Sequence, residues 1–347
     1  MLKLKSRNLT IDALRGFAIF VMVAANMAAY NYEEPHSFLF RLYGSIAAPC
    51  FIFLSGILVP YTMQVHQRKL FYFMKKSVYT LLVAASIDVF LWHLFPFSSF
   101  DVLYVIGISL ILNYFLSRLS KIFHLFVAIL LILISFFLQY FFGYETAISE
   151  ISLNDQNIFS AWFSELVLKN LFIEGWFPLF PWLGVSALGA FMGRQGNDLN
   201  QVFETKKLII IGISLLLMGI ITWGIFQPTL FVRDGYSELF YPPTISYLLT
   251  FIGLVFILLF LFHKLQSTFI SRFFSVFGQS SLLMYILHTL LVVILFKPYF
   301  NPSSFFPMFF LLYLFHLIIL WLIAFFVQKL KPYFNNYPSL IKFILGV

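Results

Sequence analysis

Long apolar stretches separated by short polar segments run through almost the whole chain. A helix that crosses the hydrocarbon core of a bilayer needs about 20 apolar residues. Windows of that size fall at residues 11–30, 46–65, 76–95, 101–119, 122–142, 176–194, 207–227, 243–263, 279–297 and 305–328. The pattern predicts an all-α, polytopic transmembrane helix bundle of ten or eleven spans, which we interpret as a single domain over residues 1–347.

The sixth window differs from the others because two prolines, Pro178 and Pro181, lie in its outer half. Proline removes a backbone donor and breaks a helix, and the freed backbone groups need protein or a wet cavity to satisfy them. Gly189 and Gly193 follow as a G-x-x-x-G pair, a spacing that commonly allows another helix to approach closely. We expect an irregular segment followed by a tightly packed helix.

Charge gives the spans a direction. With the N-terminus inside, 18 of the 22 Lys and Arg residues fall on the inner side, and the four on the outer side are Arg41, Lys169, Arg233 and Lys297. Positive charge in short loops marks the cytoplasmic face. Topology therefore explains most of the net charge of +8, with contacts to anionic lipids or to a nucleotide as the alternative, and no nucleic-acid partner is expected.

Composition agrees with a membrane protein, since the chain is 61% hydrophobic and only 10% charged, with a mean hydropathy of +0.93. The lone Cys50 excludes an intrachain disulfide and is expected to be a small buried hydrophobe. The basic start of the chain leads into the first span rather than into a cleaved signal. The single glycosylation-type triplet, at Asn8, lies on the inner side, which fits a bacterial cytoplasmic membrane.

The first span carries the most polar groups. Asp12 and Arg15 lie near its inner end, and Asn26 lies near its outer end. Asp12 and Asn26 are about 21 Å apart along the helix axis. A helix start explains the inner two, with Thr10 as the N-cap, Asp12 in the first turn and Arg15 extending toward the interface. It does not explain Asn26, and a polar group in a span calls for a partner or a role.

Histidines provide the other candidates. His36 lies in the next outer loop beside Glu33 and Glu34, where it is either a solvated side chain or an imidazole that the carboxylates orient. His288 lies mid-span, either packed and neutral or facing a cavity. Asp88, His93 and His316 are interpreted as packing residues. The spacing of the histidines suggests no metal site.

Three stretches resemble the transmembrane acetyltransferase family typified by heparan-α-glucosaminide N-acetyltransferase. The first has a D-x-x-R-G start, an asparagine, a loop histidine and a P-x-F-x-F-x-x-G span: Asp12, Arg15, Gly16, Asn26, His36, Pro49, Phe51, Phe53 and Gly56. The second runs from Glu174 to Gly193, and the third from Gly278 to the Y-x-x-H ending at His288.

The resemblance implies transfer of an acetyl group from cytoplasmic acetyl-CoA to a glucosamine-type amino sugar, or another glycan acceptor, outside. His36 and Asn26 match the catalytic positions, as base or acetyl carrier and as oxyanion donor. The CoA-binding candidates are Arg15, Asp12, Lys75, Lys76, Arg118 and Lys121. The candidates on the acceptor side are Glu174, His288, Glu33 and Glu34. No metal is expected.

Two positions depart from the family pattern. Ser45 stands where the family has an acidic residue, and Tyr104-Val105 stands where it often has Gln-Arg. A transporter or flippase for a sugar or lipid-linked substrate is the alternative, with Asp88, His93 and His288 as relays, and a catalytically inactive scaffold is a third. Transporters often contain paired broken helices, and only the sixth span is clearly broken here. Membrane lipids are expected partners, and a homodimer is left open.

Overall fold

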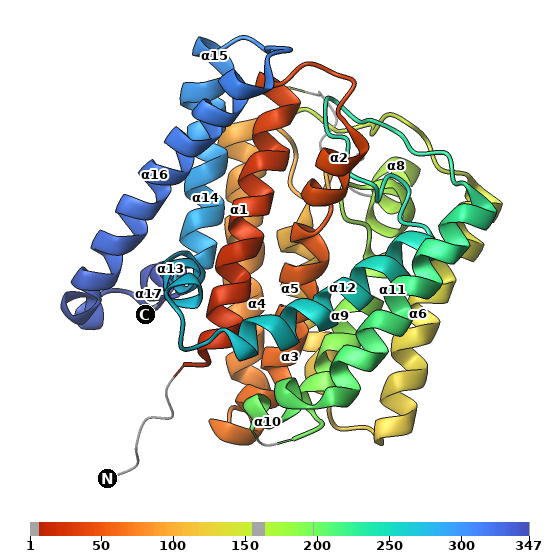
Figure 1. Cartoon of the computed structure of the whole chain (residues 1–347), viewed down its shortest axis with the longest axis vertical. Helices are drawn as coiled ribbons and strands as arrows, with labels where there is room; N and C mark the ends of the chain where they lie inside the picture. The colour runs from red at the N-terminus through yellow and green to blue at the C-terminus, as the bar shows by residue number, and fades with distance from the viewer. Residues whose placement is uncertain (1–6, 155–163, 197, 347) are drawn as a thin grey trace. The chain divides into compact units, whose positions relative to one another are not determined.

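The computed structural model describes residues 7–154, 164–196 and 198–346, and within them the chain is helical without a named strand (Figure 1). Lys3 and Lys5, two of the 18 cations assigned to the inner side, lie outside the described residues. The helices group into two compact units.

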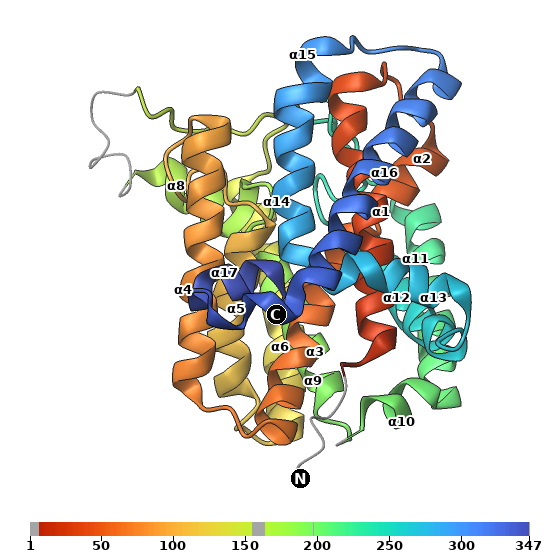
Figure 2. The ribbon, with the colours of Figure 1, turned by 90° about the vertical axis from the view of Figure 1, so that its left-hand side faces the viewer.

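Unit 1 comprises Met1–Cys50, Asp198–Gln227 and Ile245–Val347. Its helices before the tenth predicted span are α1 (Leu9–Asn31), α2 (Phe38–Gly44), α10 (Leu199–Glu204), α11 (Lys206–Phe226), α12 (Ile245–Lys264), α13 (Phe269–Gly278), α14 (Ser281–Leu291), η3 (Val292–Phe296) and α15 (Lys297–Tyr299). The C-terminal elements are α16 (Phe306–Leu330), η4 (Lys331–Asn336) and α17 (Ser339–Leu345). Helices α12, α13, α14 and α16 all pack against α1 (Figure 2).

Helix α1 begins one residue after Asn8, whose side-chain oxygen accepts a hydrogen bond from the backbone N–H of Ile11 at 3.1 Å. The prediction that Thr10 is the N-cap is therefore wrong. Asn8 caps two residues earlier because its carbonyl reaches the free N–H groups of the first turn. Thr10 lies inside the helix, and its buried hydroxyl has no hydrogen-bond partner among the described residues.

Two glycines let α13 lie directly against α1. A Cβ on Gly16 would collide with the carbonyl oxygen of Phe274, and one on Gly278 would collide with the carbonyl oxygen of Asp12. Helices that approach this closely pack through small residues. The contact fixes the N-terminal half of α1 against the end of α13.

Unit 2 comprises Phe51–Asn197 and Pro228–Thr244. Helix α3 (Ala47–Val65) begins in unit 1 and continues into unit 2. The other helices of unit 2 are α4 (Leu70–Ile87), η1 (Asp88–Trp92), α5 (Val102–Leu116), α6 (Lys121–Phe142), α8 (Glu165–Lys169), η2 (Asn170–Glu174) and α9 (Leu179–Gly193).

The predicted break in the sixth span is confirmed. The helices Glu165–Glu174 and Leu179–Gly193 meet at an angle of 42°. Phe180 is non-helical, with φ −104° and ψ 123°, because the residue before a proline is driven out of the helical region. The G-x-x-x-G pair that follows also packs as expected, since Cβ atoms on Gly189 and Gly193 would meet the carbonyl oxygens of Phe53 and Ile57 on α3.

Each of the ten predicted windows contains a helix, but their lengths differ. Eight helices in the described part of the chain are long and apolar enough to cross a bilayer, or nine when the bent pair counts as one span. The fourth window holds only the 15 residues of α5, about 22 Å of rise. Windows of 20 residues also miss the short helices α2, α10, α13 and α17.

The outward-facing surfaces agree with a lipid environment. Large apolar side chains on α6 and α11 are exposed, among them Ile122, Phe137, Ile210 and Ile221. The backbone groups of a helix are satisfied within the helix, which suits hydrocarbon surroundings. The protein is an integral membrane protein of the helical, multi-pass kind.

Candidate functional site

Asn26 and His288 meet inside unit 1. The Nδ2 of Asn26 on α1 lies 2.8 Å from the Nε2 of His288 on α14, although the residues are 262 positions apart in sequence. His288 is fully buried, whereas Asn26 is only partly buried. An unexplained asparagine of the first span thus has a partner.

The hydrogen bonds of His288 fix which ring nitrogen carries the proton. Its Nδ1 lies 3.3 Å from the carbonyl oxygen of Met284, and a carbonyl can only accept, so Nδ1–H donates. Nε2 is then the acceptor of one Asn26 amide hydrogen. The second amide hydrogen and the Oδ1 of Asn26 form no hydrogen bond with any described residue, so the amide keeps both a donor and an acceptor.

His36 lies just beyond the C-terminal end of α1, before α2. Its ring stacks on Tyr32 with centroids 5.1 Å apart, and its Nε2 is 3.2 Å from the carbonyl oxygen of Tyr32. Because that oxygen accepts, Nε2 carries the hydrogen, and a neutral ring has its lone pair on Nδ1. His36 is 8% exposed, which excludes the first of the two alternatives, a solvated loop histidine. The aromatic packing with Tyr32 and Phe40 holds the imidazole in place.

Asn26 and His36 occupy successive levels at the C-terminal end of α1, the end expected to face outward. His36 packs against Tyr32, and Tyr32 follows Asn26 by six positions along the chain, which corresponds to about 9 Å of helical rise. Glu33 and Glu34, between Tyr32 and His36, are exposed. They form an acidic rim rather than part of the buried arrangement.

The N-terminal end of α1, which is expected to face inward, carries the other two predicted residues, Asp12 and Arg15. The carboxylate of Asp12 is buried and pairs with Arg7, Oδ2 to Nε at 3.1 Å. The guanidinium of Arg15, partly buried one turn further on, forms no hydrogen bond or ion pair with any described residue. Eleven residues, about 16 Å of rise, separate Arg15 from Asn26.

The remaining predicted CoA-binding cations lie in unit 2, and three of them pack against tyrosine rings. Lys75 Nζ is 5.6 Å from the centroid of Tyr79, and Lys76 Nζ is 5.7 Å from that of Tyr72. Arg118 lies 4.6 Å from the ring centroid of Tyr114 and donates to its hydroxyl. Lys121, the first residue of α6, is exposed. That these cations share a site with Arg15 stays a prediction.

Glu174 is buried at the end of η2 in unit 2. Its Oε1 pairs with Lys169 Nζ at 3.1 Å and accepts from the backbone N–H of Glu145 at 2.9 Å. The buried Arg233 donates to the backbone carbonyl oxygens of Glu174 and Glu145 at 2.7 and 2.6 Å. Arg233 therefore joins the two long polar segments, 143–175 and 228–242, to each other, and Glu174 fixes the first of them internally.

Two carboxylates of these polar segments have opposite electrostatic environments. The hydrogen bond from Lys169 lowers the pKa of Glu145. Burial raises the pKa of Glu150, and the charges of Asp234 and Asp101 raise it further, although the indole of Trp176 donates to Glu150 at 2.8 Å. Within the described residues, no group of three or more His, Cys, Asp or Glu side chains could hold a metal ion.

The residues interpreted as packing groups differ among themselves. Asp88 is closed off by two donors, Ser99 Oγ at 3.0 Å and Tyr104 Oη at 2.5 Å. His316 is buried, stacks on Phe296 and has Nδ1 3.1 Å from Met27 Sδ. His93 is instead exposed and ends η1 in the left-handed conformation.

The long apolar helices place the chain in the class of helical, multi-pass membrane proteins. Within it, Asn26 and His288 pair inside unit 1, and His36 is held just beyond the C-terminal end of the same helix, α1. The chain belongs to the heparan-alpha-glucosaminide N-acetyltransferase catalytic family, whose model matches residues 7–219. It is thus a multi-pass transmembrane acetyltransferase. No curated protein matches the chain.

His288 lies outside the matched range, yet it contacts a residue inside it. The sequence pointed to His288 through the Y-x-x-H ending but gave no indication of its contact with Asn26. It also missed Arg7 and Lys331, which appear only as two of many inner cations. No spacing rule connects residues that come together through the packing of α1, α14 and α16.

Proposed function

We propose that the chain transfers the acetyl group of acetyl-CoA to the amine of a glucosamine-type sugar, or a related glycan acceptor, across a bacterial cytoplasmic membrane. The observation that carries this proposal is the Asn26–His288 hydrogen bond. It holds one amide hydrogen of Asn26 and leaves the other available to a substrate in a partly exposed position.

Asn26 is proposed as the oxyanion donor. When the amine attacks the thioester carbonyl, negative charge develops on the carbonyl oxygen, and a pre-oriented amide N–H stabilises it. His288 is proposed to hold the amide in that orientation. In its neutral form His288 has no hydrogen on Nε2, so it cannot donate to the substrate oxygen in place of Asn26.

His36 is proposed as the base or the acetyl carrier. In direct transfer, Nδ1 takes one proton from the acceptor ammonium, and the freed amine nitrogen bonds to the acetyl carbon. The carbon–sulfur bond then breaks, and the leaving sulfur takes the second proton from that nitrogen, so the products are the amide and the CoA thiol. In the two-step route, Nδ1 itself attacks the thioester carbon, the carbon–sulfur bond breaks and CoA leaves as the thiolate. The free amine then attacks the acetyl carbon and displaces the imidazole, which takes up the proton that the amine nitrogen loses. Either route requires the acceptor amine to reach the outer end of α1, near the rim of Glu33 and Glu34, whose charge attracts a cation.

The phosphates of CoA are proposed to bind Arg15. A cation in a span without an anionic partner is costly, and a phosphate would supply the partner. The distance between Arg15 and Asn26 along α1 fits acetyl-CoA, whose phosphates and thioester lie at opposite ends of a long arm. Asp12, Lys75, Lys76, Arg118 and Lys121 are the further candidates on the donor side. Glu174, held by Lys169, is better suited to supporting the outer segments than to binding the acceptor directly.

The test is acetyl transfer by the purified full-length protein in detergent, with labelled acetyl-CoA and glucosamine. We expect N-acetylglucosamine and free CoA in equal amounts, and loss of both in His36→Ala. Failure of the wild type to bind acetyl-CoA, or full activity in His36→Ala, would contradict the proposal. His124→Gln is a control for loss of a histidine elsewhere, since His124 contacts Arg194 and Ala187.

The orientation is tested separately in intact cells. A cysteine at position 36 is expected to react with a membrane-impermeant maleimide once the packing against Tyr32 is loosened by the substitution, while a cysteine at Lys121 is expected to be protected. The native Cys50 is buried and provides little background. Protection at position 36 together with labelling at position 121 would reverse the proposed direction of the spans.

A further inference from the structure

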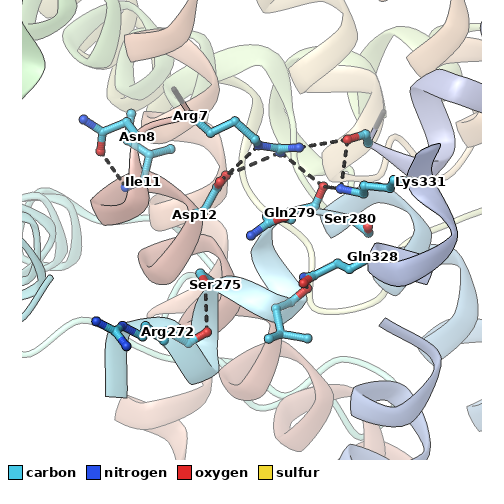
Figure 3. Close-up of polar contacts among 12 residues, drawn as sticks. Arg7, Asn8, Ile11, Asp12, Arg272, Ser275, Gln279, Ser280, Gln328 and Lys331 are labelled. Carbon is cyan, nitrogen blue, oxygen red and sulfur yellow. Dashed lines mark hydrogen bonds and ion pairs between the residues drawn. The ribbon is translucent and has the colours of Figure 1, made fainter. Parts of the chain in front are cut away.

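The corner between α13 and α14, at Gln279 and Ser280, is held by groups from both ends of the chain (Figure 3). Arg7 donates to the carbonyl oxygen of Gln279 at 3.1 Å, and Lys331 donates to the same oxygen at 3.4 Å. The hydroxyl of Ser280 donates to the carbonyl oxygen of Leu345 at 2.9 Å. The corner is thereby tied to residues that precede α1, follow α16 and end α17.

The same two cations also hold the end of α17. The carbonyl oxygen of Gly346 accepts from Arg7 at 2.8 Å and from Lys331 at 3.1 Å. Carbonyl groups at the C-terminal end of a helix carry partial negative charge, which cations neutralise. Gly346 has φ +70°, and a Cβ there would collide with the carbonyl oxygen of Gln279, so only glycine allows this approach.

Asp12 completes the arrangement from α1. Its buried carboxylate pairs with Arg7, and its backbone carbonyl lies against Gly278, the residue before Gln279. Gln328 on α16 donates to the carbonyl oxygen of Val276 at 2.7 Å, which adds a further tie to α13. We call Arg7, Asp12, Lys331 and the carbonyl groups of Gln279 and Gly346 the corner clamp.

The clamp lies at the start of the helix that carries His288. Helix α14 begins at Ser281, and seven residues, about 10 Å of rise, lead to His288. A helix transmits a displacement along its axis with little loss, and a hydrogen bond of 2.8 Å tolerates little displacement. Any slip of the corner along α1 therefore reaches the contact between His288 and Asn26.

We propose that Arg7 and Lys331 are positioning residues of the transfer reaction, acting through the register of α14 on the Asn26–His288 contact. This inference rests on the proposed function of Asn26. It makes the C-terminal helix α17 part of the catalytic arrangement, because Gly346, the residue that caps α17, supplies one of the two carbonyl groups that the cations hold. The reaction then depends on residues 279–346, which lie beyond the range of the family match.

Lys331 gives the cleaner test, because Arg7 also pairs with Asp12. We expect Lys331→Met to lower kcat about tenfold with the KM for acetyl-CoA unchanged, and Lys331→Arg, which keeps donors for both carbonyl oxygens, to stay within twofold of the wild type. The matched control is Arg272→Gln. Arg272 is an exposed cation of α13 that points away from the clamp in Figure 3, and its side chain forms no bond with any described residue.

A second measurement does not depend on activity. With nitrogen-15 label in the seven histidines, the His288 ring signals, assigned by their loss in His288→Gln, report which nitrogen carries the proton. We expect Lys331→Met to shift them and Arg272→Gln to leave them in place. A protein without acetyl transfer would refute the proposed function, while these spectra would still decide whether the clamp positions His288.

A double-mutant comparison separates positioning from general stability. Lys331→Met combined with His288→Gln is expected to be no slower than His288→Gln alone, since the clamp acts only through that histidine. Should Lys331→Met fail to fold, Ser280→Ala removes one tie of the corner and is expected to lower kcat two- to fivefold with the same shift of the His288 signals. Unchanged kcat and unchanged His288 signals in the folded variant, or additive losses in the double mutant, would overturn the inference.

Discussion

Two polar clusters lie inside predicted spans, one in each unit, and they differ in how completely their hydrogen bonds are used. In unit 2 both carboxylate oxygens of Asp88 accept from a hydroxyl, one from Ser99 and one from Tyr104. In unit 1 one amide hydrogen of Asn26 is bonded to His288, whereas its second amide hydrogen and its Oδ1 form no hydrogen bond with any described residue. Polarity inside a membrane protein therefore does not mark a site by itself, whereas unused hydrogen-bonding capacity in an accessible position does.

This difference has a physical basis. A buried polar group without a partner costs about 1–3 kcal/mol, so a cluster selected for stability satisfies all its members. A group that must bind a substrate keeps capacity in reserve and bears part of that cost. The Asp88 cluster, meaning Asp88, Ser99 and Tyr104, fits the first description, and the Asn26 pair, meaning Asn26 and His288, fits the second.

The largest expected effect is on the Asn26 pair. Asn26→Ala removes the proposed oxyanion donor, and loss of one such donor typically lowers kcat about 10²–10³-fold. The unfolding temperature is expected to change little, because the substitution leaves only one acceptor, His288 Nε2, without its bond. Steady-state kinetics and thermal unfolding of the same preparation test this, and a large loss of stability with normal kcat would reverse the contrast between the clusters.

The next effect belongs to the Asp88 cluster and has the opposite character. Tyr104→Phe leaves one oxygen of the buried carboxylate without its hydroxyl donor, which we expect to cost about 1–3 kcal/mol of stability. The kcat of the protein that stays folded is expected to match the wild type. Denaturation monitored beside activity gives both numbers, and Ser109→Ala, a serine of α5 bonded only to a backbone carbonyl, is the matched control.

The contrast between the clusters also shows what the sequence could predict. Hydropathy predicts the helices because a bilayer demands long apolar runs, and the prolines predict the bend at Phe180. Asn26 and His36 could be singled out, since a polar residue in a span needs a reason. The contact between Asn26 and His288 could not be predicted, because it joins residues 262 positions apart through helix packing. Tyr104 looked like a departure from the family pattern, and only the structure gives it a role, as the donor to Asp88.

The short elements were missed for a related reason. Helices α13 and α17 have ten and seven residues, so neither produces a hydrophobic window of membrane length. Their places depend on single contacts, such as the collision that any side chain at Gly278 would suffer with Asp12. A pattern averaged over 20 residues carries no information about such contacts.

A smaller effect sharpens the role of His288 within its pair. His288→Gln keeps an acceptor that the Asn26 amide can reach but not the fixed ring geometry, so we expect kcat to fall about tenfold, equivalent to about 1.4 kcal/mol. His288→Leu, which offers no acceptor, is expected to fall further toward the level of Asn26→Ala. Equal kcat in the wild type and in both variants would show that Asn26 needs no orienting partner.

The smallest effect extends the comparison to Glu150, a carboxylate outside the spans. It keeps the indole donor of Trp176, yet burial and the charges of Asp234 and Asp101 raise its pKa, so its ionised form opposes folding. For a carboxyl whose folded pKa lies above the unfolded value, the folded state binds more protons, and stability falls as pH rises from the ordinary value of 4.5 through the raised one.

Glu150→Gln keeps an acceptor for Trp176 and removes the charge. We expect its unfolding temperature to exceed that of the wild type by about 1–2 °C at neutral pH, a shift that corresponds to less than about 1 kcal/mol. The advantage is expected to vanish below the ordinary carboxyl pKa, where Glu150 is protonated in both states.

Glu145→Gln is the matched control with the opposite sign. Lys169 lowers the pKa of Glu145, so loss of the Glu145 carboxylate should destabilise the protein at neutral pH. Thermal unfolding of the three proteins across this pH range decides the matter, and a Glu150→Gln advantage that persists unchanged at acidic pH would show that charge is not its source.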